Sequence, residues 1–261
     1  AEDGALRGVL FEHAAHPVIV HMASTLFSAD FPGYACNHLT TALGADVATL
    51  FVQGCGADIN GDPLAAGFEA ADAAGKKLAD AVAIAIAGAT PITEDTLTVT
   101  SRVIELPCRE APPLAEVQAK LVETQAEIAA EPSEWADDRI VALTDLIRMI
   151  EAGETPAMRV DLALLALGRE WGMMCFSGEM FCEYQLWFDE ASPFAHTMVG
   201  AYTNNFGGYI ATDAELSLET LGGYEAACWP TGSCALIVPT RLALQIGIEQ
   251  IIKQAVTDMW A

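Results

Sequence analysis

Basic side chains are scarce in this sequence. Its 261 residues include 12 lysines and arginines against 36 aspartates and glutamates, which gives a formal net charge of -24. Such a surface repels phosphate groups, so nucleic acid and anionic membranes are poor partners. The acidic residues are scattered and form no block, which favours a solvated, salt-adapted surface, while attraction of a cationic ligand stays open as the alternative.

Long apolar runs are also missing. The longest stretch, Ala81 to Ala87, is far shorter than the roughly 20 residues that a membrane helix needs, so we expect a soluble protein without a membrane span. The hydrophobic content of 52% suffices for one large core, or for one domain with a smaller lobe. No leader peptide is recognisable from Ala1 onward.

Several motifs of common enzyme classes are absent. There is no Gly-x-Ser-x-Gly elbow, which excludes the usual serine hydrolase, and no Walker or Gly-x-Gly-x-x-Gly loop that would support nucleotide binding. The seven cysteines are odd in number and include no Cys-x-x-Cys pair, so we expect small core residues and no disulfide framework. A cytoplasmic location is slightly favoured over secretion on this ground, and the compartment otherwise stays open.

The sequence does contain alternating strand-like and helix-like segments, which predict an α/β protein. Strands are expected at residues 9–13, 48–52, 97–106 (half-buried), 158–167 and 172–176. Helices are expected from the Ser28 cap to about Leu43, at 65–87, across a glutamate-rich helical insertion at 112–152, and at 235–260 with Leu244 and Ile248 on its apolar face. Asp3-Gly4 is a hairpin signal that either is accidental or requires an upstream partner strand.

Histidines are the first candidates for chemistry. There are five in the chain: His13, His16, His21, His38 and His196. Their spacings match no zinc motif, so each taken alone is better explained as structural. His16 stands out because it ends a strand just before a proline, where loops often carry function.

Three further segments carry small polar or acidic residues after predicted strands. In Phe176-Ser-Gly-Glu-Met, Glu179 is expected in the first turn of a helix, where it either favours the helix dipole or serves as a metal ligand at the sheet's carboxyl end. The loop 54–61, with Gly56 and Asn60, has glycines that let backbone N–H groups converge on an anion or oxyanion. Tyr209, after Asn204-Asn-Phe-Gly-Gly, is either a strand aromatic or a site residue.

Taken in order, these segments resemble the neutral/alkaline, non-lysosomal ceramidase family. The matching segments are Phe11-Glu-His-Ala-Ala-His-Pro, Ser28-Ala-Asp-Phe-Pro-Gly-Tyr, Gln53-Gly-Cys-Gly-Ala-Asp-Ile-Asn, Ser177-Gly-Glu, Gly208-Tyr-Ile-Ala-Thr and Gly222-Gly-Tyr-Glu. The resemblance implies a mixed sheet flanked by helices, with residues 1–261 forming the C-terminal portion of one catalytic domain. It also implies Zn²⁺ ligands at His16, Glu179 and Tyr209, and a Tyr224 that helps to hold the substrate carbonyl beside Gly56 and Asn60. Glutamate and tyrosine are hard oxygen ligands, so Mn²⁺ or Fe²⁺ stays open.

Three departures from the family pattern bear on this expectation. The family's other zinc histidine belongs to a His-Thr-His-Ser-Gly-Pro-like segment that this chain lacks, so we expect an upstream segment or a second chain to supply it. Asn60 stands where ceramidases have serine, which favours a substrate other than ceramide. Ceramidases carry a C-terminal immunoglobulin-like domain, whereas we expect none in this sequence, which stops at the predicted helix 235–260.

The function expected on this basis is zinc-dependent hydrolysis of an amide C–N bond in a small molecule or a lipid-like substrate. Hydrolysis of a different, smaller amide or ester is favoured over ceramide hydrolysis itself. The alternative is a non-catalytic binding or assembly subunit that keeps the fold. Retention of His16, Glu179 and Tyr209 together argues against that alternative, since a dead site need not keep all three.

Overall fold

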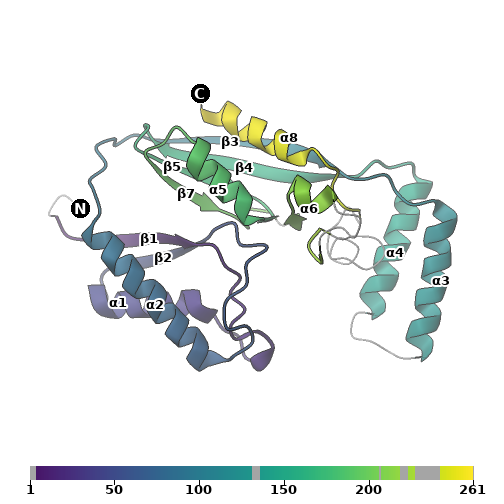
Figure 1. Cartoon of the computed structure of the whole chain (residues 1–261), viewed down its shortest axis with the longest axis horizontal. Coiled ribbons are helices and arrows are strands. Elements are labelled where there is room, and N and C mark those ends of the chain that lie inside the picture. Colours follow the sequence, from purple (N-terminus) through teal and green to yellow (C-terminus); the bar gives the residue numbers. More distant parts are fainter. Residues whose placement is uncertain (1–3, 131–135, 206, 218–222, 227–241, 261) are drawn as a thin grey trace. The chain divides into compact units, whose positions relative to one another are not determined.

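The computed structural model describes residues 4–130, 136–205, 207–217, 223–226 and 242–260 (Figure 1). The fold is α/β, with helices and a mixed sheet, as the sequence predicts. The chain forms two compact units, each of which is described by itself. Unit 1 comprises Ala1–Val99, Leu164–Cys175 and Cys182–Ala201, and unit 2 comprises Thr100–Ala163, Phe176–Phe181 and Tyr202–Ala261.

Unit 1 begins with a pair of parallel strands. Strand β1 (Gly8–His13) pairs with β2 (Ala48–Gln53) in a register that sets Phe11 opposite Phe51. The alternation of side chains along β1 buries Phe11 and leaves Leu10 45% exposed on the other face. Helices α1 (Asp30–Leu43) and α2 (Phe68–Ala87) lie side by side against this pair (Figure 1).

The two helices approach each other closely at Gly75 of α2. A Cβ atom at this position would lie 2.5 Å from the Cβ of Tyr34 and 2.7 Å from the carbonyl oxygen of Phe31. The start of α1 is held by Asp30, whose carboxylate accepts the backbone N–H groups of Val20 and Phe31, each at 2.7 Å. The cap expected at Ser28 is wrong, because Ala29 occupies the N-cap position of α1 without a side-chain cap; the Ser28 hydroxyl instead accepts the N–H of Asp30 at 2.9 Å.

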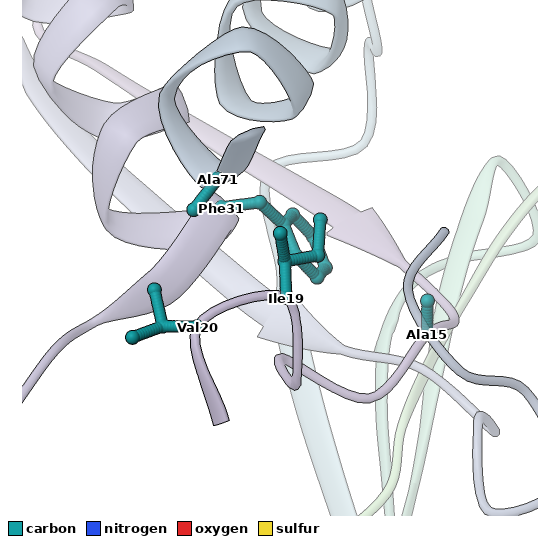
Figure 2. Packing of buried hydrophobic residues seen from close by; sticks show 5 residues of the cluster. All are labelled: Ala15, Ile19, Val20, Phe31 and Ala71. Carbon is teal, nitrogen blue, oxygen red and sulfur yellow. The ribbon is translucent and has the colours of Figure 1, made fainter. Parts of the chain in front are cut away.

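A small apolar cluster connects these helices to the segment that follows β1. It consists of Ala15, Ile19, Val20, Phe31 and Ala71. Figure 2 shows Ile19 and Phe31 close to Ala71 of α2, while Ala15 lies apart from them on the segment that follows β1. This packing holds residues 15–20, and with them His16, against the helices.

A four-stranded sheet has the order β3-β4-β5-β7. Its strands are β3 (Leu97–Pro107), β4 (Ala157–Leu167), β5 (Trp171–Phe176) and β7 (His196–Gly200), and β5 and β7 are parallel. Helix α5 (Cys182–Ala191) lies between β5 and β7 in sequence. The half-burial expected of β3 is wrong, because the strand is exposed over most of its length, including Leu97, Val99 and Val103.

Unit 2 contains the predicted helical insertion as two helices, α3 (Leu114–Ala130) and α4 (Ala136–Glu151), which pack side by side (Figure 1). Its other elements within the described residues are the short strands β6 (Glu179–Met180) and β8 (Tyr209–Ile210), helix α6 (Asp213–Ser217), helix α8 (Ile248–Thr257) and a 3-10 turn at Asp258–Trp260. Another 3-10 turn, His21–Ala23, belongs to unit 1. Arg102 of β3 pairs with Asp258 at 2.8 Å.

Two predicted elements need correction. Glu179 does not begin a helix, because its N–H donates to the carbonyl of Gly208 at 2.9 Å and strand pairing holds the backbone extended; the helix starts at Cys182. The C-terminal helix begins at Ile248, and Leu244 instead forms an antiparallel bridge to Cys108. The rest of that prediction, residues 235–241, lies outside the described residues, as does Asp3 of the hairpin signal.

The remaining general expectations concern cysteines and membranes. Cys55, Cys108 and Cys175 are buried, as expected of core residues, while Cys36 and Cys182 are half-buried. Cys228 and Cys234 lie outside the described residues. In the part of the chain that the structure describes, no helix combines the length and apolarity needed to cross a bilayer.

Candidate functional site

His16 is fixed by the glycine-rich loop that the sequence singles out. Its backbone forms a parallel bridge with Asn60, and its N–H donates to the carbonyl of Ile59 at 2.8 Å. Its ring Nδ1 lies 2.5 Å from the carbonyl oxygen of Gly56. A carbonyl oxygen only accepts hydrogen bonds, so Nδ1 carries the proton and Nε2 carries the lone pair. This is the tautomer that a metal-binding histidine uses when a backbone carbonyl orients it.

Gly56 has a structural reason to be glycine. A Cβ atom there would lie 2.8 Å from the backbone nitrogen of Ala15 and 2.9 Å from Nε2 of Gln53. Its carbonyl also accepts the N–H of Ile59 at 3.2 Å, so the same oxygen closes the loop and orients His16. Sequence reasoning assigns Gly56 through the loop's N–H groups, whereas the contact that the structure shows is made by its carbonyl.

The loop is anchored to the rest of unit 1 by a carboxylate–amide network. Gln185 of α5 accepts the N–H of Cys55 at 3.0 Å and donates to Glu12 of β1 at 2.5 Å. Glu12 also accepts the N–H of Val199 at 2.8 Å. Burial raises the pKa of Glu12. Gly54 is required beside this network, because a Cβ there would lie 2.5 Å from the Glu12 carboxylate.

A cavity of about 480 Å³ adjoins Asn60 within unit 1. Its walls include the apolar side chains of Phe31, Ile59 and Leu78, with His13 and Lys77 among its polar lining. The His13 ring meets Phe31 edge-on at 5.8 Å, and burial lowers the pKa of His13. Mostly apolar cavities of this size with a few polar groups are typical of small-molecule sites.

In unit 2, strand pairing brings Glu179 and Tyr209 together. The two are register partners in the parallel β6–β8 pair, and only 6% of Glu179 is exposed. The Tyr209 hydroxyl is hydrogen-bonded to the Glu179 carboxylate. Burial, and then the negative charge of Glu179, raise the pKa of Tyr209. The pair therefore holds a proton between two oxygen atoms.

Tyr224 lies beside this pair. Its ring meets that of Tyr209 edge-on, with 5.8 Å between the ring centroids. Its side chain is 54% exposed, and Glu225, the next residue, contributes to the raised pKa of Tyr209.

Sequence reasoning missed a third tyrosine at this place. The hydroxyl of Tyr202 donates to Oε2 of Glu179 at 3.2 Å. Tyr202 lies in the connection from β7 to β8, seven positions before Tyr209. No motif or spacing distinguishes it, so only the folded chain identifies it.

The six predicted residues thus fall into two groups. His16, Gly56 and Asn60 meet in unit 1, and Glu179, Tyr209 and Tyr224 meet in unit 2. The donor chemistry of both groups fits a divalent cation such as Zn²⁺. A buried carboxylate and a phenol that share a proton become two oxygen donors when a cation takes the proton's place, and His16 has the required tautomer.

A different set of potential ligands lies in unit 1. Among the described residues, Asp58, Cys182 and Glu183 are the group of three whose donor atoms lie close enough together to hold a metal. Asp58 accepts the Cys182 N–H at 2.8 Å and the thiol at 3.2 Å. Burial and Asp58 raise the pKa of Cys182 to about 12, so the thiol keeps its proton. We interpret Asp58 as a cap of α5, because its carboxylate accepts the N–H of Cys182 at the first position of that helix.

Comparisons with known proteins agree with the fold. No protein-family model matches the sequence, and no curated protein matches it either. Among solved structures, the chain is similar to the neutral ceramidase from Pseudomonas aeruginosa, with a TM-score of 0.55 and 18% sequence identity over 85% of this chain. The match covers 41% of the ceramidase, so this chain spans less than half of that protein's length. The chain therefore has a ceramidase-like fold.

Proposed function

We propose that this protein is a metal-dependent hydrolase that cleaves an amide C–N bond, with Zn²⁺ bound by His16, Glu179 and Tyr209. The observation that carries the proposal is the Glu179–Tyr209 pair, in which two neighbouring strands present a buried carboxylate and a half-buried phenol to each other. The tautomer of His16 supports it independently. The similarity to a neutral ceramidase is consistent with both.

A bound zinc ion supplies Lewis-acid activation of water and of the scissile carbonyl. The protein's own residues have separate tasks in this proposal. Gly56 holds His16 in the tautomer that presents Nε2. Glu179 and Tyr209 provide oxygen donors, of which the Glu179 carboxylate belongs to a residue that is only 6% exposed. Tyr224, exposed beside Tyr209, donates its hydroxyl to the substrate carbonyl, for which one such donor is worth about 3–4 kcal/mol.

The proposed substrate is an amide other than ceramide with an apolar portion. Asn60, which replaces the serine of ceramidases, adjoins the mostly apolar cavity of unit 1. An apolar group of the substrate fills this cavity in our proposal. We also propose that residues 1–261 are part of a larger catalytic domain, and that a histidine on an upstream segment or a second chain completes the ligand set.

The proposal is tested by metal content. Elemental analysis of the purified protein should find near-stoichiometric zinc, and Glu179→Ala should lose it. Glu183→Ala is the matched control, because Glu183 is an exposed glutamate of the Asp58–Cys182–Glu183 group. Zinc lost on Glu183→Ala and retained on Glu179→Ala would place the metal at that group and refute the proposed site.

Activity is the second part of the test. Zinc-loaded protein should release free amine from N-acyl substrates, and Glu179→Ala should not. An intact-mass spectrum of the same sample shows whether a second polypeptide accompanies the chain, as the proposed upstream histidine requires.

A further inference from the structure

Tyr202 adopts an unusual backbone conformation in unit 2. Its φ angle is +59°, in the left-handed region that aromatic residues rarely occupy. Two hydrogen bonds hold it there: its N–H donates to the carbonyl of Gly178, and the N–H of Thr203 donates to that of Phe176, each at 3.0 Å. The acceptors belong to the segment that immediately precedes Glu179. The backbone that positions Glu179 therefore positions Tyr202 as well.

The side chain of Tyr202 contacts Glu179 as well. Its hydroxyl donates to Oε2 of Glu179, so the segment 176–179 is connected to Tyr202 through both backbone and side chain. A carboxylate that is only 6% exposed needs hydrogen-bond donors when it is ionised. Backbone strain of this kind clusters at functional sites, where the surrounding structure compensates for it.

The two tyrosines that contact Glu179 have different roles in the proposal. Tyr209 would be a metal ligand, whereas Tyr202 would hold Oε2 of Glu179 through its hydroxyl. A hydrogen bond to one oxygen restricts the carboxylate's rotation and selects a single geometry for the ligand.

We propose that Tyr202 is a positioning residue that orients the Glu179 carboxylate for the bound metal. The inference rests on the proposed metal site and adds a residue to it. The competing explanation is that Tyr202 only supports the fold of the β7–β8 connection. Removal of the hydroxyl alone distinguishes the two explanations, since ring packing and both backbone hydrogen bonds survive in Tyr202→Phe.

The experiment measures Zn²⁺ affinity by competition with a chelating indicator, together with thermal unfolding of the metal-free protein. We expect Tyr202→Phe to bind zinc about 10- to 100-fold more weakly, the usual effect of removing a partner that orients a ligand. The metal-free protein should unfold at a temperature only a few degrees lower, because it loses one hydrogen bond to a buried carboxylate. The matched control is Tyr34→Phe, because Tyr34 packs against the apolar cluster of unit 1 and should leave zinc affinity unchanged.

The two readouts together exclude a merely structural role. If Tyr202 only supported the β7–β8 connection, Tyr202→Phe would lower the unfolding temperature without the expected loss of zinc affinity. Wild-type zinc affinity in Tyr202→Phe, with Glu179→Ala losing zinc, overturns the role of Tyr202 and leaves the proposed site intact. Equal zinc binding by wild type, Glu179→Ala and Tyr202→Phe refutes the site, and the positioning role with it.

Discussion

The ring Nδ1 of His16 is hydrogen-bonded to the carbonyl oxygen of Gly56, a residue forty positions further along the chain. The contact fixes the histidine's tautomer through a residue that has no side chain. The loop reaches His16 because Gly56 allows its backbone to approach Ala14 and Ala15. The chemistry of His16 is thus coupled to the shape of the glycine-rich loop.

This coupling predicts the effect of Gly56→Ala. The added Cβ would lie 2.8 Å from the nitrogen of Ala15, so the loop must shift and the Gly56 carbonyl moves with it. Overpacking of this kind costs about 1–3 kcal/mol in the free energy of unfolding, measured by urea denaturation. Zinc affinity should fall as well, because His16 loses its orientation.

Gly88→Ala serves as the control for that variant. Its added Cβ meets nothing closer than 3.8 Å and its backbone is not left-handed, so its stability should stay close to that of wild type. Gly56→Ala protein with wild-type zinc affinity would show that the carbonyl contact does not orient the histidine.

A second substitution tests the packing of α1 against α2. Gly75→Ala places a methyl group 2.5 Å from the Cβ of Tyr34. Alanine gains about 1 kcal/mol in helix propensity over glycine, but a clash with the backbone of α1 costs about 1–3 kcal/mol. We expect the clash to prevail because the obstructing atoms include the carbonyl of Phe31 and the nitrogen of Ala35. A midpoint of urea unfolding above the wild-type value would contradict this.

The sequence predicted most elements because their local signals are strong. The proline at position 32 marks the first turn of α1, the apolar periodicity identifies α2, and the alternation along residues 97–106 identifies β3. The conformation of Glu179 was predicted wrongly, because the local signals favour a helix start at this residue. Pairing with Tyr209, thirty residues away, decides the conformation instead, and a two-residue strand leaves no periodic pattern to read.

The sequence singles out His16, Gly56 and Tyr209 as site candidates because a residue type and a motif coincide at each of them. Tyr202 was not, because its role depends on a left-handed backbone and on bonds to the segment at Gly178. The same applies to Gln185, whose contact with the loop depends on where α5 lies. Roles of this kind follow from tertiary contacts and have no local sequence signature.

The stability of unit 1 should depend on pH through Glu170. Hydrogen bonds from the N–H groups of Glu94 and Thr93 and from the Thr93 hydroxyl lower the pKa of this exposed carboxyl. An acid with a lowered pKa stabilises the fold above its unfolded-state pKa, about 4.3, and the contribution is lost as the pH falls through the native value. Glu170→Gln should therefore lower the urea midpoint at pH 7, with a difference that shrinks below about pH 4.

Glu105→Gln is the control for this titration, since Glu105 is an exposed glutamate on β3. Its urea midpoint should follow wild type at every pH. A difference between Glu170→Gln and wild type that stays constant from neutral to acidic pH would show that the carboxylate's charge is irrelevant.

The last prediction separates a helix cap from a metal ligand at Cys182. With the pKa of Cys182 raised to about 12, only about one thiol in ten thousand is ionised at pH 8, so iodoacetamide should label it slowly. Asp58→Asn removes a negative charge from beside the thiol and should speed labelling about tenfold or more, as followed by peptide mapping. Cys36 in the same digest is the internal control. If added zinc protected Cys182 from iodoacetamide, the thiol would be a ligand and the capping interpretation would fail. If zinc leaves its labelling rate unchanged, the Asp58 carboxylate acts on the thiol and on the first turn of α5 alone.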